Sequence, residues 1–182
     1  MSRLRRSNRG FSLVELMFTV AFAATLMAIA VPVMTDVSDN SKLNGAAREL
    51  ERELQAARMK SVSANRLLRV RLNCPSAGQY RTVEYVSSVA VDNATNRCSQ
   101  SAYPFPADND VMTRPNYDGP IRLLPHGATV TTNIIEFHPD GTAYTVVSNV
   151  VTTIPTSVSL TVTRKSRTRS ITINGASKIQ LQ

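Results

Sequence analysis

The most prominent pattern in this chain is an apolar run near the N-terminus. From Phe11 to Met34 the residues are apolar or small, and a single charge, Glu15, interrupts them. A helix of about 24 residues is roughly 36 Å long and exceeds the ~30 Å hydrocarbon core of a bilayer. Four arginines precede the run, and the first ten residues contain no acid. A basic start holds the N-terminus in the cytoplasm, so we predict a single membrane-spanning helix over 11–34.

The pattern becomes amphipathic beyond this run. Between Val37 and about Asn65, apolar residues recur at steps of three and four, which is typical of one helix face. This stripe comprises Leu43, Ala47, Leu50, Leu54 and Ala57. We therefore predict that the helix continues through residues 35–66 and lays the stripe on a sheet. Pro32 removes one backbone hydrogen bond, so we predict a bend or a local break there.

After Arg66 the pattern alternates between apolar and polar residues, as in β-strands. Strands are predicted at 67–72, 80–86, 128–138, 142–151, 157–164 and 168–174, with a short one at 177–181. Residues 87–119 are rich in Ser, Asn, Asp and Pro and are predicted to form a long loop. Turns are expected at 140–141 and 165–167, and Ile135 and Phe137 are expected to pack inward. The predicted fold is α+β, with one long helix packed on an antiparallel sheet.

Glu15 needs a partner, because an ionised side chain inside a bilayer costs a few kcal/mol. If the chain is cut after Gly10, Phe11 becomes a cationic N-terminus, one helical turn from Glu15. Within one chain, an acid is favoured at this end of the helix dipole. Between copies, Glu15 of one helix could meet the amine of the next and set the axial register. The alternative is that Glu15 reaches the membrane surface and has no such role.

Residues 9–16 read Arg-Gly-Phe-Ser-Leu-Val-Glu-Leu, which resembles the class III signal of type IV prepilins and type II secretion pseudopilins. The resemblance implies cleavage between Gly10 and Phe11 by a prepilin peptidase and N-methylation of Phe11. It also implies retention of the helix as an assembly stem, with Pro32 at the usual helix-softening position. The division is then a leader (1–10), a membrane helix (11–34), an amphipathic half (35–66) and a periplasmic domain (67–182). Such a chain resides in the inner membrane and then joins other pilins in a filament.

The C-terminal half carries a second resemblance. Residues 135–141 read Ile-Glu-Phe-His-Pro-Asp-Gly, and residues 169–175 read Arg-Ser-Ile-Thr-Ile-Asn-Gly. Together they are similar to the GspH/FimT pseudopilin domain, in which a Phe-x-x-x-Gly turn precedes a final hairpin. A type IV pilin-like fold is therefore implied. Residues 73–127 match no family pattern.

The net positive charge of the chain comes from its two ends. Of the net charge of +8, the leader arginines supply four, and no acid follows Asp140. The candidate anion-binding residues of this acid-free segment are Arg164, Lys165, Arg167, Arg169 and Lys178. Such a cluster could hold DNA phosphates in a salt-dependent way. Alternation places Arg167 and Arg169 on one strand face and Arg164 and Lys165 at the turn.

DNA is also a partner that the second resemblance implies. FimT-like minor pilins bind DNA in natural transformation, usually through a Gly-Arg-x-Arg segment in the last strand. Here the segment reads Gly175-Ala176-Ser177-Lys178 and has one cation. The alternative to DNA binding is a solvated turn, or one that pairs with acids of a neighbouring subunit.

Cys74 and Cys98 are the only cysteines, and both lie beyond the predicted membrane helix. Outside the cytoplasm, two such residues favour a disulfide. Closing a loop of about 25 residues would stabilise the fold by roughly 3 kcal/mol. Two unpaired thiols are the alternative.

The sequence shows no pattern typical of an enzyme. The two histidines, His126 and His138, each adjoin a proline, and no metal-ligand spacing is visible. The glycines are scattered singly, so no phosphate-binding loop is indicated. We therefore predict a subunit without catalytic residues, metal or cofactor. The candidate functions are a pilus or pseudopilus subunit, with roles in a type IV pilus or in type II secretion both open, and a DNA-binding minor pilin.

Overall fold

The computed structural model describes residues 10–86, 92, 95–106, 117–147 and 150–182. Its chain divides into two compact units, Met1–Asp39 and Asn40–Gln182. Helix α1, Leu13–Ala64, begins in the first unit and ends in the second. Every described side chain from residue 10 to residue 38 is exposed. By length and composition, α1 contains a segment able to cross a membrane, and none of that segment is buried.

The helix does not break at Pro32. This proline lies inside α1, which remains α-helical on both sides of it. Proline removes only one hydrogen bond, and the bonds of the neighbouring turns persist. The Thr35 hydroxyl also donates to the Pro32 carbonyl oxygen at 2.8 Å. The predicted local break is therefore wrong for this state of the chain, and softening during filament assembly stays a prediction.

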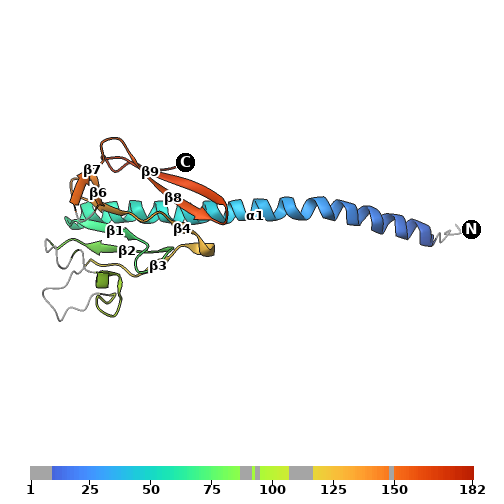
Figure 1. The fold of residues 1–182 in the computed structure, drawn as a ribbon, viewed down its shortest axis with the longest axis horizontal. Coiled ribbons are helices and arrows are strands. Elements are labelled where there is room, and N and C mark those ends of the chain that lie inside the picture. Colours follow the sequence, from blue (N-terminus) through green and yellow to red (C-terminus); the bar gives the residue numbers. More distant parts are fainter. Residues whose placement is uncertain (1–9, 87–91, 93–94, 107–116, 148–149) are drawn as a thin grey trace, which may run out of the picture. The chain divides into compact units, whose positions relative to one another are not determined.

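The strands form two antiparallel sheets in place of the single sheet expected (Figure 1). The six-stranded sheet A has the order β3-β2-β1-β5-β6-β7, and the four-stranded sheet B has the order β10-β9-β8-β4. The strands of sheet A are β1 (Leu68–Leu72), β2 (Gln79–Glu84), β3 (Arg122–Leu123), β5 (Ile134–Phe137), β6 (Ala143–Val147) and β7 (Val150–Thr153). Those of sheet B are β4 (Thr129–Val130), β8 (Val158–Arg164), β9 (Arg167–Ile173) and β10 (Ile179–Leu181). Two short 3₁₀ turns, η1 (Thr95–Cys98) and η2 (Pro125–Gly127), lie in the connections.

Both sheets contribute to one hydrophobic core around the second half of α1. The predicted stripe is confirmed, because Leu43, Ala47, Leu50, Leu54 and Ala57 are all buried. Ile135 and Phe137 of sheet A pack inward as expected, and Leu160 and Ile171 of sheet B join them. The Ser61 hydroxyl lies 2.8 Å from the Phe137 carbonyl oxygen and ties the end of α1 to β5. An α+β fold with a long helix on antiparallel sheets is confirmed.

Two predicted strands are each divided in two. In place of the strand predicted at 142–151 the structure has β6 and β7, which pair antiparallel, with Val147 opposite Val150. The valines on either side make the pattern look continuous, although Ser148 and Asn149 between them are residue types that favour turns. Residues 128–138 form β4 and β5, which belong to different sheets. Polar residues 131–133 separate these strands, and the Asn73 side chain donates to the Val130 carbonyl oxygen there at 2.9 Å.

The two predicted turns are present. At the first, the Gly141 amide donates to the His138 carbonyl oxygen at 2.9 Å, and Gly141 has a φ of 85°. A positive φ favours glycine, which explains this residue in the turn. At the second, Lys165 and Ser166 connect β8 to β9, and Arg167 is already in β9.

Candidate functional site

The predicted cleavage site lies immediately before α1. Gly10 and Phe11 are exposed and precede the first helical residue, Leu13. Apart from its two chain neighbours, no atom of the described residues lies within 4 Å of a Cβ added to Gly10. The fold therefore does not require a glycine at this position. If a glycine is needed here, another molecule that binds this segment must require it.

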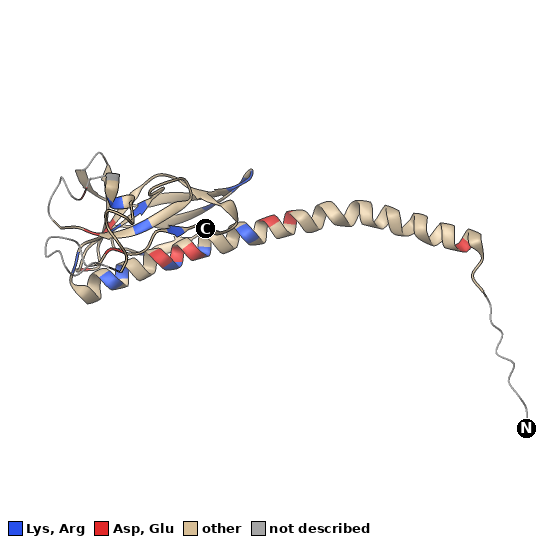
Figure 2. Ribbon diagram, turned by 90° about the horizontal axis from the view of Figure 1, so that it is seen from below, with Lys and Arg blue, Asp and Glu red and all other residues tan. Residues whose placement is uncertain are grey.

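Glu15 occupies the first turn of α1. In the part of the chain that the structure describes, its carboxylate makes no hydrogen bond or ion pair. The side chains that follow along this half of the helix are apolar and exposed, among them Phe18, Phe22 and Ile29. Figure 2 shows the long uncharged part of α1, which contrasts with the charged part beside the sheets. An exposed apolar helix with one acid at its start can be stable only in lipid or against other helices.

The basic hairpin of β8 and β9 directs its arginines toward the core side of sheet B. Arg164 is paired across the hairpin with Arg167, and Arg169 lies two residues further along β9. Arg167 and Arg169 share their strand face with Ile171 and Ile173, which are buried. Arg169 donates through Nε to Asn44 Oδ1 of α1 at 2.7 Å. The shared face of Arg167 and Arg169 is thus the one that packs against the helix.

Four of the five candidate cations lie on this hairpin, and the fifth, Lys178, does not. Arg164 donates through Nε to the His126 carbonyl oxygen at 2.9 Å, and Lys165 is exposed at the tip of the turn. Lys178 lies beyond the opposite end of β9, and its backbone amide donates to Asn174 Oδ1 at 2.8 Å. Fewer cationic side chains of the hairpin are therefore available to an external anion than its sequence indicates.

The predicted disulfide is present between Cys74 and Cys98, whose Cα atoms are 5.1 Å apart. Both residues are buried. Cys74 follows β1, and Cys98 ends η1, so the bond fastens the long connection to sheet A.

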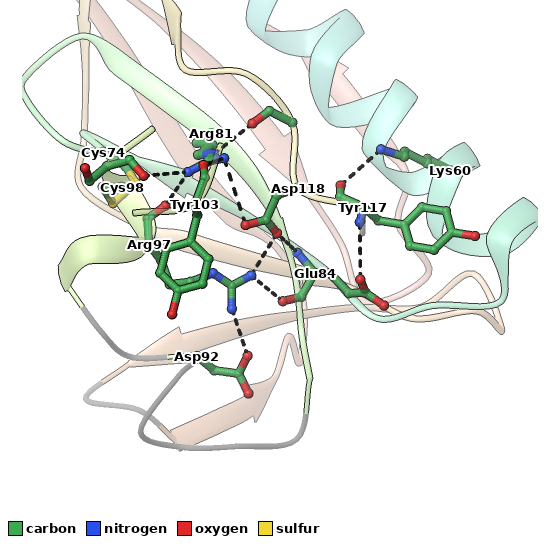
Figure 3. Close-up of polar contacts among 12 residues, drawn as sticks. Lys60, Cys74, Arg81, Glu84, Asp92, Arg97, Cys98, Tyr103, Tyr117 and Asp118 are labelled. Atoms are coloured by element: carbon green, nitrogen blue, oxygen red, sulfur yellow. Dashed lines mark hydrogen bonds and ion pairs between the residues drawn. A yellow bond between two sulfur atoms is a disulfide. The ribbon is translucent and has the colours of Figure 1, made fainter. Parts of the chain in front are cut away.

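Beside the disulfide lies a buried group of charges that no pattern in the sequence predicts (Figure 3). This arginine cluster consists of Arg81, Arg97, Asp92 and Asp118, all at most 4% exposed. Arg97 Nη2 donates to Asp118 Oδ1 at 2.8 Å and to the Glu84 carbonyl oxygen at 2.7 Å. Its Nη1 lies 3.4 Å from Asp92 Oδ1. The two arginines and two aspartates balance in charge, as buried ions must.

Arg81 holds the backbone of the long connection. It donates through Nε to the Gly119 carbonyl oxygen at 2.8 Å and through Nη2 to the Tyr103 carbonyl oxygen at 2.6 Å. Burial lowers the pKa of Arg81, and the nearby Asp118 carboxylate opposes that shift. These contacts join segments that are distant in sequence, so no local pattern could have identified them.

A second buried ion pair lies between β1 and β5. Arg69 Nε and Glu136 Oε2 are 2.5 Å apart, and both side chains are buried. His138 Nε2 lies 2.7 Å from the other carboxylate oxygen, and its ring centroid is 4.3 Å from that of Tyr144. His138 thus belongs to a local polar network at the end of β5. Among the described residues, no three His, Cys, Asp or Glu side chains gather as a metal site would require.

Comparison with known proteins identifies the family. The family model described as type II transport protein GspH matches residues 46–177. This chain is a member of the GspH family. The resemblance of its C-terminal half to that domain is thereby confirmed.

Two solved structures similar to this GspH-family chain are crystal structures of the type IV minor pilin FimU from Pseudomonas aeruginosa strain PAO1. Both are 17% identical to it. The P21 crystal form has a TM-score of 0.49 and covers 80% of this chain and 92% of FimU. The P65 form has a TM-score of 0.44 and covers 76% and 91%, respectively. None of the curated proteins compared with the chain matches it.

Some of the candidate residues lie within the range matched by the GspH family model, and others lie outside it. The disulfide, the arginine cluster and the basic hairpin lie within residues 46–177. Gly10, Phe11, Glu15 and Pro32 lie before the matched range, and Lys178 lies just after it. The roles of these five residues therefore rest on the sequence pattern and the geometry described above.

Proposed function

We propose that this GspH-family chain is a pilin-like subunit of a type IV pilus or a related filament. The leader is removed between Gly10 and Phe11 by a prepilin peptidase, and Phe11 is N-methylated. The helix over 11–34 anchors the chain in the inner membrane, with the domain in the periplasm, and then enters the filament. One observation carries this proposal: an exposed apolar helix with a single acid in its first turn continues into the core of a GspH-family domain.

The type IV pilus and the type II secretion pseudopilus are both compatible with this stem. The family description points to type II transport. The net positive charge that remains after loss of the leader favours the pilus. Identifying which assembly genes accompany this one would separate the two roles.

Replacing Gly10 by valine is expected to block processing, so that the chain keeps residues 1–10. The reason is that an added Cβ has open space among the described residues, so we expect the substitution to act on recognition by the peptidase and to leave the fold unchanged. Gly45→Val is the matched control, since Gly45 is exposed in α1 and also has open space around it. Intact mass measured on membrane fractions reads out the result. Normal removal of the leader from the Gly10 variant would contradict the cleavage proposal.

DNA binding on the same scaffold is the second candidate function. Its support is the exposed Lys165 at the hairpin tip and the absence of acids after Asp140. Against it, Arg164 and Arg169 already donate hydrogen bonds within the chain. The subunit role therefore has the stronger support.

We expect the full chain in detergent to give no salt-sensitive retardation of duplex DNA in a gel-shift assay. Phosphate contacts weaken steeply with added salt, so a titration from low to moderate salt distinguishes them from other binding. The comparison variant replaces Arg164, Lys165, Arg167 and Arg169 by alanine. Retardation of DNA by the native chain that this variant loses would establish the DNA role.

A further inference from the structure

Strand β7 is an open edge of sheet A. It pairs with β6 on one side, and no other described strand pairs with its outer side. All four of its residues are exposed, with Val150 at 62% and Val151 at 41%. In an antiparallel edge strand, alternate residues direct their N–H and C=O groups away from the sheet. The outer side of β7 can therefore accept another strand.

This edge lacks the features that normally keep edges from pairing. Native edges are commonly guarded by charged side chains, inward-pointing lysines or prolines within the strand. The sequence has no charged residue from Gly141 to Thr163, and β7 itself reads Val-Val-Thr-Thr. These β-branched residues form favourable cross-strand pairs. An uncharged extended strand is thus the partner that this edge fits.

Strand β10 is a second open edge, and a groove lies beside it. It occupies one end of sheet B. The groove has a volume of about 660 Å³ and is lined by Arg48, Glu51, Arg52, Ile179, Gln180 and Leu181. None of the residues of β10 is charged. The space beside β10 is large enough to admit an added strand.

The direction of β7 follows from contacts with the second half of α1. Residue Leu68, at the start of β1, pairs with Phe137, whose carbonyl oxygen contacts Ser61. At the other end of β1, Leu72 pairs with Tyr80 of β2, and Tyr80 pairs in turn with Arg122 of β3. Arg122 forms an ion pair with Glu53, which lies earlier in α1 than Ser61. Strand β1 therefore runs opposite to α1. Since β5, β6 and β7 follow by successive antiparallel pairings, β7 runs in the same direction as α1.

Strand β10 runs opposite to β7 and to α1. Strand β9 passes from Arg169, which contacts Asn44, toward Gly175, whose carbonyl oxygen accepts the Ala143 amide. This end of the domain is close to Arg58, because the Arg58 guanidinium lies next to Gly141. Strand β9 thus runs with α1, and β10, which is antiparallel to it, runs against α1. Copies that stand with parallel helices would present β7 and β10 in opposite directions.

We propose that β7 of one copy pairs antiparallel with β10 of a neighbouring copy. The inference rests on the proposed function, because a common membrane anchor holds the helices of neighbouring copies parallel. The contact is head-to-tail, joining two different surfaces, and such contacts generate rings or open filaments. Antiparallel pairing of β7 with β7 of another copy would require opposite helix directions, which a common anchor does not allow. Parallel pairing of two β7 strands is compatible with the anchor but gives the less stable ladder.

The other described edges are poorer partners for β7. Strand β3 has only two residues, and one of them, Arg122, is held by Glu53. Strand β4 also has two residues and runs parallel to β7, because it pairs antiparallel with β8. Of the edges in the described ranges, β10 combines an uncharged strand, the opposite direction and an adjacent groove.

Cysteine cross-linking of the full-length chain in cell membranes tests this pairing. One copy carries Val151→Cys and a first tag, and the other carries Gln180→Cys and a second tag. Opposed residues in antiparallel strands have Cβ atoms about 4.5–5.5 Å apart, close enough for a disulfide after small adjustments. The native cysteines are buried and bonded to each other. Mild oxidation should produce a dimer that carries both tags.

The matched control pairs Val151→Cys with Ser159→Cys, because Ser159 is exposed on β8, an interior strand of sheet B. We expect the 151–180 pair to cross-link at least about tenfold more than this control, because pairing raises the local concentration of the two thiols. Equal yields would overturn the proposal. A Val151→Cys dimer with a single tag, or a cross-link to a different protein, would overturn it as well.

Filament incorporation, scored in the same cells, separates this proposal from the proposed function. Chains that are present in sheared filaments but lack the 151–180 cross-link would overturn the strand pairing and leave the subunit role intact. Chains that are absent from filaments but form the cross-link in membranes would overturn the filament role and support the pairing.

Discussion

Replacing Glu15 by alanine is expected to remove this chain from filaments and to leave its folded domain unchanged. Glu15 lies in the first turn of α1 and has no hydrogen bond or ion pair within the described residues. If its partner is the Phe11 amine created by cleavage, the substitution leaves that cation unpaired in an apolar environment. An unpaired charge there costs at least about 2.5 kcal/mol, which corresponds to roughly 60-fold or more in incorporation.

The amount of chain in sheared filaments, relative to the amount in membranes, measures this effect. Glu49→Ala is the matched control, because Glu49 lies in the same helix but beside the sheets. Thermal unfolding of both variants should match that of the native chain. If Glu15 merely reached the membrane surface, the Glu15 variant would enter filaments as well as the control does.

Replacing Asp118 by alanine is expected to destabilise the domain by about 3–5 kcal/mol, because it leaves Arg97 buried without its nearest carboxylate. Asp118 Oδ1 accepts hydrogen bonds from Arg97 Nη2 and from the Glu84 amide, both at 2.8 Å. The Arg97 side chain is fully buried and cannot turn to water. Urea unfolding of the full chain in detergent, with the disulfide kept oxidised, gives the change in the free energy of unfolding.

The matched control for this measurement is Asp140→Ala, which removes an aspartate from an exposed turn. Asp140 accepts hydrogen bonds from Thr142, and these bonds lower the pKa of the carboxyl. Its loss should cost much less than the loss of Asp118, since solvent can replace those contacts. A cost for Asp118→Ala no larger than that of the control would show that the arginine cluster does not hold the long connection in place.

The parts of the fold that sequence could predict are those set by local periodicity. The stripe from Leu43 to Ala57 repeats at the helical period, so both the helix and its buried face followed from it. The turn at Gly141 was predictable because glycine tolerates a positive φ. The pairing of Cys74 with Cys98 was predictable because the chain has no other cysteine.

The parts that could not be predicted depend on contacts between distant residues. Arg97 and Asp118 are 21 positions apart, and nothing local marks either as buried. Alternation placed Arg167 and Arg169 on one face but could not say that the face is directed toward α1. The valine-rich pattern across β6 and β7 predicts a single strand, since periodicity alone does not show where a short strand ends and the next begins.

In the proposed function, the chain is cut after Gly10 and enters a filament with Phe11 at its start. Mass spectrometry of the N-terminal peptide from chains recovered in sheared filaments distinguishes a cut chain from an uncut one. We expect a peptide that begins at N-methylated Phe11. A filament-associated chain that begins at Met1, or one that begins beyond Val31, would contradict it.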